Sequence, residues 1–305
     1  MQQQNTVCDF STSDSWVILS PIEQSIKRKI EAVGTPLKDW DIQINYGIKT
    51  GFNDAFIIST DKREEILANC KTEDERKRTA ELIRPILRGR DIKRYGYEWA
   101  NLWLIATFPS RHYDIDRYPA VKQYLLSFGI ERLEQTGKTY IVNGEKVKSR
   151  KKTNNKWFET QDSISYWEDF NKPKIVYGQF QDGAEYSFAE PGIFLSSNEY
   201  MLIVQNYSSK CLLAFLNSKP SEWLLSKITG NLGGNSKIGQ KSNFLKLSIA
   251  ILDEEQQQIF EKLVDEILLS KVDSPTLDLL INNKIYEIYG FSKEESDLIE
   301  SQKSQ

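Results

Sequence analysis

Histidine and cysteine, the residues that most often build metal sites and nucleophilic catalytic centres, are scarce in this chain of 305 residues. The single histidine, His112, excludes sites with several histidine ligands and leaves one candidate partner for a serine or cysteine nucleophile. The three cysteines, Cys8, Cys70 and Cys211, lie far apart and form no Cys-x-x-Cys pair. Their spacing and odd number argue against a disulfide framework and against a zinc site. We therefore expect reduced, structural cysteines and no metal site.

Long apolar runs are also missing. The longest, Cys211–Leu216, has six residues, whereas a membrane-spanning helix needs about 20. The first twenty residues contain Asp9 and Asp14 but no lysine or arginine, so they do not resemble a secretory signal. We expect a chain with no membrane segment and a cytoplasmic location.

Motifs of catalysts that act on nucleic acid are absent as well. No Pro-Pro step occurs, although a methyltransferase acting on a base amino group needs an Asn/Asp-Pro-Pro-Tyr/Phe loop for the flipped base. The glycine-rich stretch Gly230–Gly239 has the spacing of neither a dinucleotide fingerprint nor a P-loop. The triplet Asp91-Ile92-Lys93 is a short acid-x-Lys match to a metal-dependent nuclease, which needs further carboxylates around its ion. We expect no catalysis by this chain alone.

Charge is distributed unevenly along the chain. The net charge is −3, but residues 253–305 hold 13 acidic residues against five lysines, a net charge of −8, so residues 1–252 carry +5. Within this basic part, Lys146–Lys156 contains six cations and no acid, with Trp157 directly after it. Clustered cations displace the counterions of nucleic acid, and aromatic rings can pack on sugars or bases. The segment fits either a phosphate-contacting loop or a solvated surface loop.

Periodicity predicts interleaved helices and strands without a regular β-α-β rhythm, hence an α/β fold with a mixed sheet. Ile22, Ile26 and Ile30 share one face of a helix over residues 21–33, with Ser20 as its N-cap. A helix over 73–83 is expected to stop before Pro85. The other expected helices lie at 210–216 and 222–228, and the expected strands at 40–46, 55–58, 102–107, 175–180 and 200–204.

The end of the chain is acidic and helical. Apolar residues recur at helical spacing over 254–269 and over 275–289. Gly290 is expected to stop the second of these helices, and Ser292 with Glu295 forms a capping box that starts a short last helix. We therefore divide the chain into a body, residues 1–252, and a helical arm, residues 253–305, that packs on the body or docks a partner.

Several blocks of sequence carry a family resemblance. Tyr46–Phe56 (YGIKTGFNDAF) followed by Leu82–Tyr95 (LIRPILRGRDIKRY) resembles the TaqI-like C-terminal specificity domain of type IIG restriction-modification enzymes. Asn155–Glu159 (NKWFE) and Phe170–Ile175 (FNKPKI) are similar to the following blocks of that family, and Ile285–Phe291 (IYEIYGF) is similar to its closing helix.

This resemblance covers nearly the whole chain, from residue 16 to about residue 299. It implies a target-recognition domain that grips duplex DNA opposite an N-terminal adenine methyltransferase and supplies loops that read the sequence. S-adenosylmethionine and magnesium would then be needed only by the methyltransferase and nuclease part, and this chain would bind no cofactor. The chain is either a fragment of such an enzyme or a separate specificity subunit, and both readings stay open.

Two of the resembling blocks contain candidate DNA contacts. In the turn Gly47–Gly51, glycine permits a close approach of Lys49, Thr50 and backbone N–H groups to a phosphate, and a plain turn between strands is the alternative. In the second block, Asp91 is expected to fix an arginine by a bidentate pair while the other cations face outward. The alternative there is an ion-pair cluster that touches no DNA. The cations concerned are Arg88, Arg90, Lys93 and Arg94.

The segment Lys146–Lys156 is the strongest candidate for reading bases. Arg150 can bond guanine O6 and N7, and Asn154 or Asn155 can bond adenine N6 and N7. The remaining candidates for contact with DNA are Lys146, Lys148, Lys151, Lys152 and Lys156, together with Lys237 and Lys241 around the glycine-rich stretch.

Two functions from other classes stay open. One is a metal-dependent nuclease that uses Asp91, Lys93 and a further acid. The other is a protein-interaction subunit whose acidic helices bind a partner while the basic segment only keeps the chain soluble.

Overall fold

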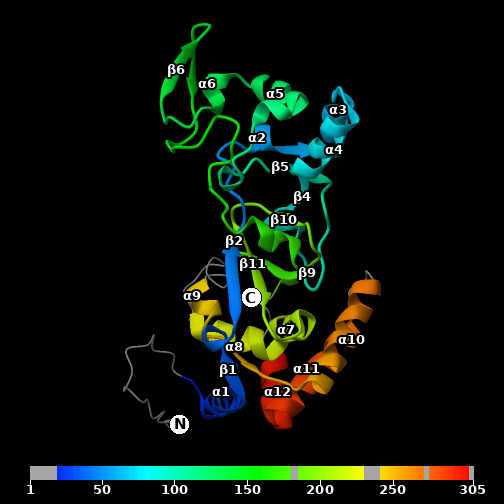
Figure 1. Cartoon of the computed structure of the whole chain (residues 1–305). Helices are drawn as coiled ribbons and strands as arrows, with labels where there is room; N and C mark the ends of the chain where they lie inside the picture. Colours follow the sequence, from blue (N-terminus) through cyan, green and yellow to red (C-terminus); the bar gives the residue numbers. More distant parts are fainter. Residues whose placement is uncertain (1–18, 180–184, 230–240, 271–274, 302–305) are drawn as a thin grey trace.

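The structure is a computed structural model that describes residues 19–179, 185–229, 241–270 and 275–301. The molecule is elongated, with most of the long helices at one end and a β-hairpin projecting at the other (Figure 1). Buried apolar side chains of the described residues form two clusters. We call the cluster around Ile26, Phe215 and Ile285 the helical core, and the cluster around Phe56 and Leu104 the distal core. The mixture of helices and small sheets confirms the predicted α/β fold.

An antiparallel sheet of four strands lies between the two cores. In order across the sheet, its strands are β2 (Ile42–Tyr46), β11 (Glu199–Val204), β8 (Lys174–Gly178) and β9 (Tyr186–Ala189). Successive side chains of a strand point to opposite faces, so Ile175 and Tyr177 enter the helical core while Val176 enters the distal core. Leu202 and Met201 of β11 divide in the same way. Burial on both faces explains why β8 and β11 continue as unbroken apolar runs after their first residues, Lys174 and Glu199, rather than alternating.

Helices and a small two-stranded sheet surround the helical core. The strands β1 (Gly34–Pro36) and β12 (Ser248–Ala250) pair antiparallel, and the 3-10 helix η1 (Leu37–Asp39) follows β1. Ser20 begins α1 as predicted, because its hydroxyl accepts from the Glu23 N–H while the Glu23 carboxylate accepts from the Ser20 N–H. The helices are α1 (Pro21–Val33), α7 (Ser209–Leu216), α8 (Lys219–Thr229), α9 (Lys241–Phe244), α10 (Glu254–Ser270), α11 (Pro275–Tyr289) and α12 (Lys293–Ser301).

The predicted ends of the C-terminal helices are confirmed. Gly290 ends α11 with a φ of 65°, and the Ser292 N–H donates to the Glu295 carboxylate at 2.7 Å in the expected capping box. The same carboxylate accepts from Lys29 of α1 at 2.7 Å, so the capping residue also joins α12 to α1. No helix of the described part is long and apolar enough to cross a membrane.

The C-terminal helices pack on the rest of the chain. Phe260 of α10 and Ile285 of α11 belong to the same core as Ile26 of α1 and Phe215 of α7. The rings of Phe215 and Phe260 lie 5.3 Å apart. Residues on both sides of Leu252 thus share one core, and a domain boundary at this position stays a prediction.

A second sheet of four strands forms the distal core. Its order is β10 (Phe194–Leu195), β4 (Ile83–Leu87), β5 (Leu102–Ile105) and β3 (Ile57–Ser59), with β10 parallel to β4 and the other pairs antiparallel. The helices here are α2 (Asn53–Phe56), α3 (Thr60–Ala68), α4 (Glu73–Leu82), α5 (Pro119–Leu126) and α6 (Ile130–Leu133). Four 3-10 helices connect these elements: η2 (Gly89–Asp91), η3 (Pro109–Arg111), η4 (Ile115–Arg117) and η5 (Trp167–Asn171).

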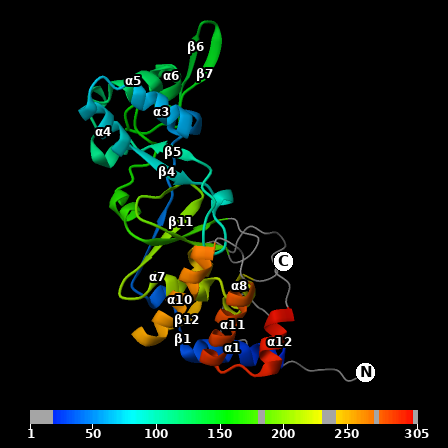
Figure 2. The same ribbon diagram turned by 90° about the vertical axis from the view of Figure 1, so that its right-hand side faces the viewer.

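The projecting hairpin consists of β6 (Thr139–Val142) and β7 (Glu145–Lys148), which pair antiparallel. Asn143 and Gly144 join the strands and both have positive φ, 50° and 84°. A two-residue turn with both φ values positive is type I′, for which Asn-Gly is the preferred pair. Figure 2 shows the hairpin at the opposite end of the molecule from α1 and α12.

Most predicted helices and buried strands are confirmed, and the exceptions have local causes. The prediction of a strand over 55–58 is wrong in its first half, because Ala55 and Phe56 end α2 and β3 begins at Ile57. A four-residue apolar run fits a buried helical turn as well as a strand. Sequence reasoning also does not predict α3, α5 or the hairpin, although Asn143-Gly144 is a strong hairpin signal.

A buried lysine, Lys174, is the first residue of β8 in the central sheet. The ammonium group of Lys174 in β8 has no exposed surface and donates to the backbone carbonyls of Phe170, Lys172 and Glu190 at 2.9, 3.2 and 3.0 Å. Burial lowers the pKa of Lys174 from 10.5 to about 8, and the charge of Glu190 works weakly in the opposite direction.

This lysine makes the stability of the fold depend on pH. Below pH 8 both the folded and the unfolded chain hold the proton, whereas between pH 8 and 10.5 only the unfolded chain holds it, so this site adds stability as pH rises. Lys174→Met leaves three carbonyls without a donor and should lower the free energy of unfolding by about 2 kcal/mol at pH 7. The difference should widen by about 1 to 2 kcal/mol at pH 9.5 in urea titrations. An equal difference at both pH values would contradict this assignment.

Candidate nucleic-acid interface

Arg150 lies at the base of the hairpin and is buried, with 2% of its surface exposed. Its guanidinium donates to four backbone carbonyls: Leu133 at 2.7 Å, Thr50 at 2.9 Å, Glu159 at 2.7 Å and Trp157 at 2.6 Å. Burial lowers the pKa of Arg150 to about 10, so the side chain stays charged at neutral pH. The sequence predicts that this arginine reads a guanine. With its donors directed inward, it instead joins three segments of chain, and we leave it out of the interface.

The turn Gly47–Gly51 is one of the segments that Arg150 holds. The Gly47 N–H donates to the Glu199 carbonyl at 2.7 Å, and a Cβ on Gly47 would lie 1.7 Å from the Ser196 carbonyl oxygen, so only glycine fits. Thr50 is also buried, with its hydroxyl donating to the Asn53 side chain and accepting from the Phe52 N–H. These groups bond within the protein, as the plain-turn alternative requires, and Thr50 cannot reach a phosphate from this position.

Lys49 differs from its neighbours because its side chain is exposed. It lines an open groove of about 640 Å³ that follows β7. The groove is also lined by cations of β7, of the residues after it and of α6, and no acidic side chain lines it. The buried Arg150 contributes to the lining, and the other cations are Arg132, Lys146, Lys148 and Lys151. We call Lys49 and these four residues the cationic groove.

The fold therefore brings together two segments that lie about a hundred residues apart in sequence. Lys49 comes from the turn after β2, and Lys146, Lys148 and Lys151 come from the hairpin and its exit. Asp162 lies close to this groove: burial raises the pKa of its carboxyl, while the charges of Lys49 and Lys151 act to lower it. No ion pair joins these five cations to an acidic side chain of the described residues, so they give the groove a positive potential that favours an anionic ligand.

Arg132 is the member of the groove that sequence reasoning misses. Its guanidinium lies 3.9 Å from the ring centre of Phe52 and donates to the Lys148 carbonyl at 3.1 Å. The cation–π contact and the hydrogen bond hold it beside β7. An isolated arginine in a helix gives no sequence signal of this kind, because both of its partners come from other elements.

The remaining residues of the basic segment have different surroundings. Lys152, Asn154 and Lys156 are exposed. Asn155 is half-buried, and its amide donates to the carbonyls of Thr160 and Gln161 at 3.2 and 2.8 Å, so it braces the loop. Of the two asparagines predicted to read adenine, Asn154 is thus the one whose side chain faces solvent.

The cations of the second candidate block, around η2, fall into two groups: some bond within the protein and others are exposed. Arg88 donates from Nε and from a terminal nitrogen to the two carboxylate oxygens of Asp91, at 3.0 and 2.8 Å, which confirms the predicted bidentate pair. Burial disfavours the charged carboxylate, but the hydrogen bonds from Arg88 hold the pKa of Asp91 below its usual value. Arg94 pairs with Asp278 of α11 and donates to the Asn217 carbonyl, so it serves the packing of α11. Arg90 and Lys93 are exposed.

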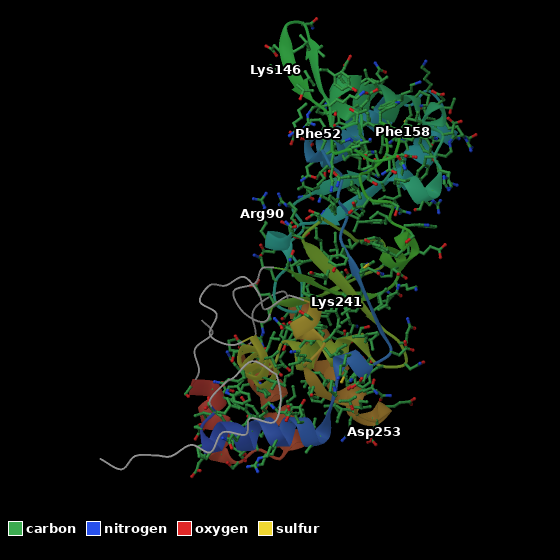
Figure 3. The ribbon with its side chains drawn as sticks, turned by 90° about the vertical axis from the view of Figure 1, so that its left-hand side faces the viewer. Phe52, Arg90, Lys146, Phe158, Lys241 and Asp253 are labelled. Atoms are coloured by element: carbon green, nitrogen blue, oxygen red, sulfur yellow. The ribbon has the colours of Figure 1, made fainter. Side chains whose placement is uncertain are left out.

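A second buried carboxylate supports η2 from the central sheet. Glu199 of β11 is buried, and a Cβ on Gly89 would lie 2.9 Å from one of its oxygens. Burial raises the pKa of Glu199, while hydrogen bonds from Ser196 and from the Gly89 backbone lower it. In Figure 3, Lys146 and Arg90 lie toward the same edge of the molecule, one above the other. Arg90 of η2 thus lies toward the same edge as the hairpin in this view.

The other predicted residues lie elsewhere. Lys237 falls outside the described residues. Lys241 begins α9 and is half-buried, with its ammonium group 3.5 Å from the Ile44 carbonyl. Within the described ranges, no three histidine, cysteine or acidic side chains are placed to hold a metal ion.

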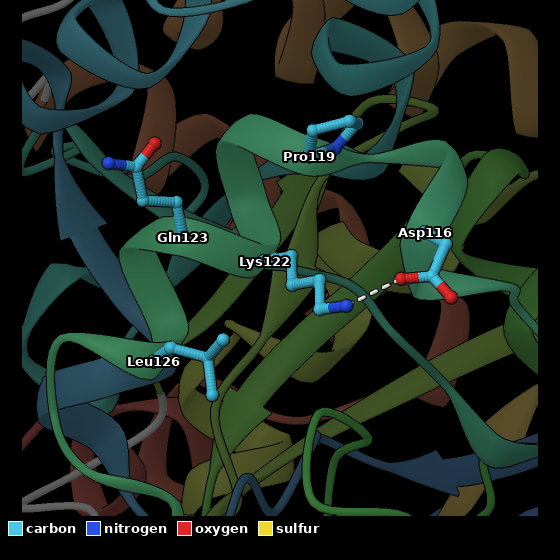
Figure 4. Close-up of a pocket in the computed structure, with 5 residues that line it drawn as sticks. All are labelled: Asp116, Pro119, Lys122, Gln123 and Leu126. Atoms are coloured by element: carbon cyan, nitrogen blue, oxygen red, sulfur yellow. Dashed lines mark hydrogen bonds and ion pairs between the residues drawn. The ribbon is translucent and has the colours of Figure 1, made fainter.

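A separate shallow pocket on α5 has a different character. Lys122 forms an ion pair with Asp116 at 2.6 Å across it, and Pro119, Gln123 and Leu126 complete its lining (Figure 4). Its one cation is already paired, so the charge that favours an anionic ligand is concentrated in the cationic groove.

The position of Arg150 predicts a large effect on stability. Arg150→Met leaves four carbonyls without a donor and should lower the free energy of unfolding by about 3 to 5 kcal/mol. Arg150→Lys should recover part of this loss, because an ammonium group has only three donors and no planar fork. The matched control Lys151→Met, at the exposed neighbouring position, should stay within about 0.5 kcal/mol of the wild type. Urea denaturation measures all three variants. An Arg150→Met chain as stable as the wild type would contradict the stabilising role of the hydrogen bonds from Arg150.

Comparisons with known proteins identify the family and the fold. The TaqI-like C-terminal specificity domain family matches residues 84–242, about half of the chain. No curated protein matches the chain. Among solved structures, the type IIG restriction endonuclease BpuSI matches with a TM-score of 0.53 and 14% identity, over 92% of this chain and 33% of that chain. The type IIL restriction-modification enzyme MmeI, solved in complex with DNA, matches with a TM-score of 0.51 and 12% identity, over 88% of this chain and 37% of that chain.

The chain thus spans about a third of the length of these two enzymes. At identities of 14% and 12%, the likeness to these two enzymes shows the fold alone. The match of residues 84–242 to the family supports the family assignment. The chain belongs to the family of TaqI-like C-terminal specificity domains.

Proposed function

We propose that this chain binds duplex DNA and selects the target sequence for a type IIG restriction-modification system. An adenine methyltransferase and nuclease, joined to it as an N-terminal domain or present as a separate subunit, would carry out the chemistry. Membership in a family of specificity domains supports the recognition role.

The observation that carries the proposal is the cationic groove. Lys49, Lys146, Lys148 and Lys151 line one groove that no acidic side chain lines, although they come from separate parts of the sequence. A charge arrangement of this kind is unfavourable in the isolated protein because like charges repel each other. Phosphates would neutralise it and release the counterions condensed on DNA, which is the main sequence-independent source of affinity for nucleic acid.

A second group of outward cations extends the proposed contact. Arg90 and Lys93 lie on and beside η2, held by the pair between Arg88 and Asp91. Arg90 and Lys146 lie toward the same edge of the molecule in Figure 3. A duplex along this edge would meet cations at two separate levels, and contacts at two levels fix its orientation as well as its affinity.

Base reading would follow after these phosphate contacts. Asn154 is exposed between Lys152 and Lys156, so its amide can approach the N6 and N7 atoms of an adenine. Arg150 and Asn155 would support this loop from beneath through their bonds to backbone carbonyls. The target would thus be read by side chains of the loop, while the buried arginine keeps the loop in place.

The cofactors would belong to the catalytic part of the system. We propose that S-adenosylmethionine and magnesium bind there and not to this chain. Asp91, the acid considered for a nuclease, is buried and has both carboxylate oxygens hydrogen-bonded to Arg88, so its charge is already paired within the protein. The same bonds disfavour the nuclease alternative for this chain.

Charge reversal in the groove tests DNA binding. The triple variant Lys146→Glu, Lys148→Glu and Lys151→Glu should lose affinity for random duplex DNA on the order of a hundredfold at low salt. Its plot of log affinity against log salt should also become shallower, by about 0.9 for each phosphate contact that is lost. Fluorescence anisotropy at several salt concentrations measures both quantities.

A matched control separates this effect from a change in net charge. Lys38, Lys262 and Lys293 are exposed lysines around the helical core, and changing them to glutamate gives the same net charge. We expect nearly wild-type affinity for that variant. Equal affinities for the two triple variants would contradict DNA binding by the cationic groove and would favour the protein-interaction alternative.

Cleavage can be tested separately with supercoiled plasmid. With magnesium present, the purified chain should leave plasmid intact, and Asp91→Ala should give the same result. Nicking by the wild-type chain that disappears in Asp91→Ala would overturn the assignment of catalysis to a partner.

A further inference from the structure

Ile141 is an exposed apolar side chain on an otherwise polar surface. It lies on β6, two residues before the turn, and 67% of its surface is exposed. Its partner in the hairpin is Lys146, and the next pair on the same face is Thr139 with Lys148. The pairs on the opposite face are Tyr140 with Val147 and Val142 with Glu145.

A single exposed isoleucine is ordinary on a protein surface, so its surroundings decide whether it has a role. The hairpin projects away from the distal core (Figures 1 and 2), and no contact with the rest of the described chain covers this face. Both neighbouring side chains from β7, Lys146 and Lys148, also line the cationic groove. Charge complementarity therefore points to DNA as the molecule that covers Ile141.

The dimensions of a two-stranded ribbon select one groove of the duplex. Strands lie about 4.8 Å apart before side chains are added, which suits the major groove, about 12 Å wide, and exceeds what the minor groove, about 6 Å wide, admits. Ile141 lies two residues from the turn, or about 7 Å behind the tip, which is within the major-groove depth of about 8.5 Å. Lys148 lies two residues further from the tip than Lys146, and in this docking it would lie at the level of the phosphates.

The only apolar group that the base pairs present in the major groove is the 5-methyl group of thymine. We propose that Ile141 is a specificity-determining residue that packs on the 5-methyl group of a pyrimidine while Lys146 and Lys148 bind the flanking backbone. The inference rests on the proposed function, because it needs the duplex to lie along the hairpin. It adds an apolar contact to a recognition surface that is otherwise cationic and polar.

Removal of single methyl groups from the DNA tests this contact. The probe is a duplex enriched by the wild-type chain from a random pool, in which each thymine is replaced in turn by deoxyuridine. At one position the wild-type chain should lose affinity about fourfold, the value expected for one buried methyl-sized group. Ile141→Gln should bind the thymine and deoxyuridine forms equally at that position.

The matched control is Ile251→Gln. Ile251 is 61% exposed and follows β12, far along the chain from the hairpin, so this change removes a similar exposed side chain outside the interface. It should keep the fourfold preference for thymine. Because both positions are exposed, both variants should fold, and circular dichroism checks this.

The outcomes separate this inference from the proposed function. If the chain binds duplex DNA but no deoxyuridine substitution changes the affinity, or if the enriched site has no A·T pair, the methyl contact is overturned and DNA binding stands. A thymine preference that persists in Ile141→Gln also overturns it. If neither the wild-type chain nor the chain joined to its catalytic partner binds duplex DNA, the proposed function fails and this inference fails with it.

Discussion

The hydrogen bonding of the Arg150 guanidinium is the interaction on which the rest of the candidate interface depends. A buried cation without a carboxylate partner needs hydrogen-bond acceptors for its donors, and here four backbone carbonyls from three segments accept four of its five N–H groups. This arrangement fixes the base of the hairpin against the turn that carries Lys49. The lysines on either side of Arg150 are left on the surface. One internal cation thus positions several external ones, which is why a run of six cations does not act as a uniform basic patch.

The central sheet gives this interface a rigid support. Its strands β8 and β11 are buried on both faces and connect the helical core to the distal core. Glu199 at the start of β11 contacts both the turn after β2, through its carbonyl, and η2, through its side chain. Glu199 therefore supports both the turn that carries Lys49 and the 3-10 helix that carries Arg90. A recognition module needs this kind of fixed spacing, because phosphates along a duplex are regularly spaced.

Local signals in the sequence predict the local parts of the structure. Ser20 with Glu23 and Ser292 with Glu295 lie three residues apart, so both capping boxes can be recognised without knowledge of the fold. The bidentate pair of Arg88 with Asp91 is local for the same reason. The burial of Arg150 cannot be predicted in this way, since one of its acceptors, the Thr50 carbonyl, lies a hundred residues away in sequence. Sequence composition identifies the cations of the basic segment, but tertiary contacts decide which of them face the solvent.

The central claim is that the cationic groove binds duplex DNA, and a salt titration of the intact chain tests it most directly. Fluorescence anisotropy with a random duplex pool should show log affinity falling steeply and linearly with log salt, with about 0.9 of slope for each phosphate contacted. Sequencing of the bound fraction should then reveal an enriched short motif. The absence of binding at low salt, both for the chain alone and for the chain joined to the proposed methyltransferase, would contradict the account.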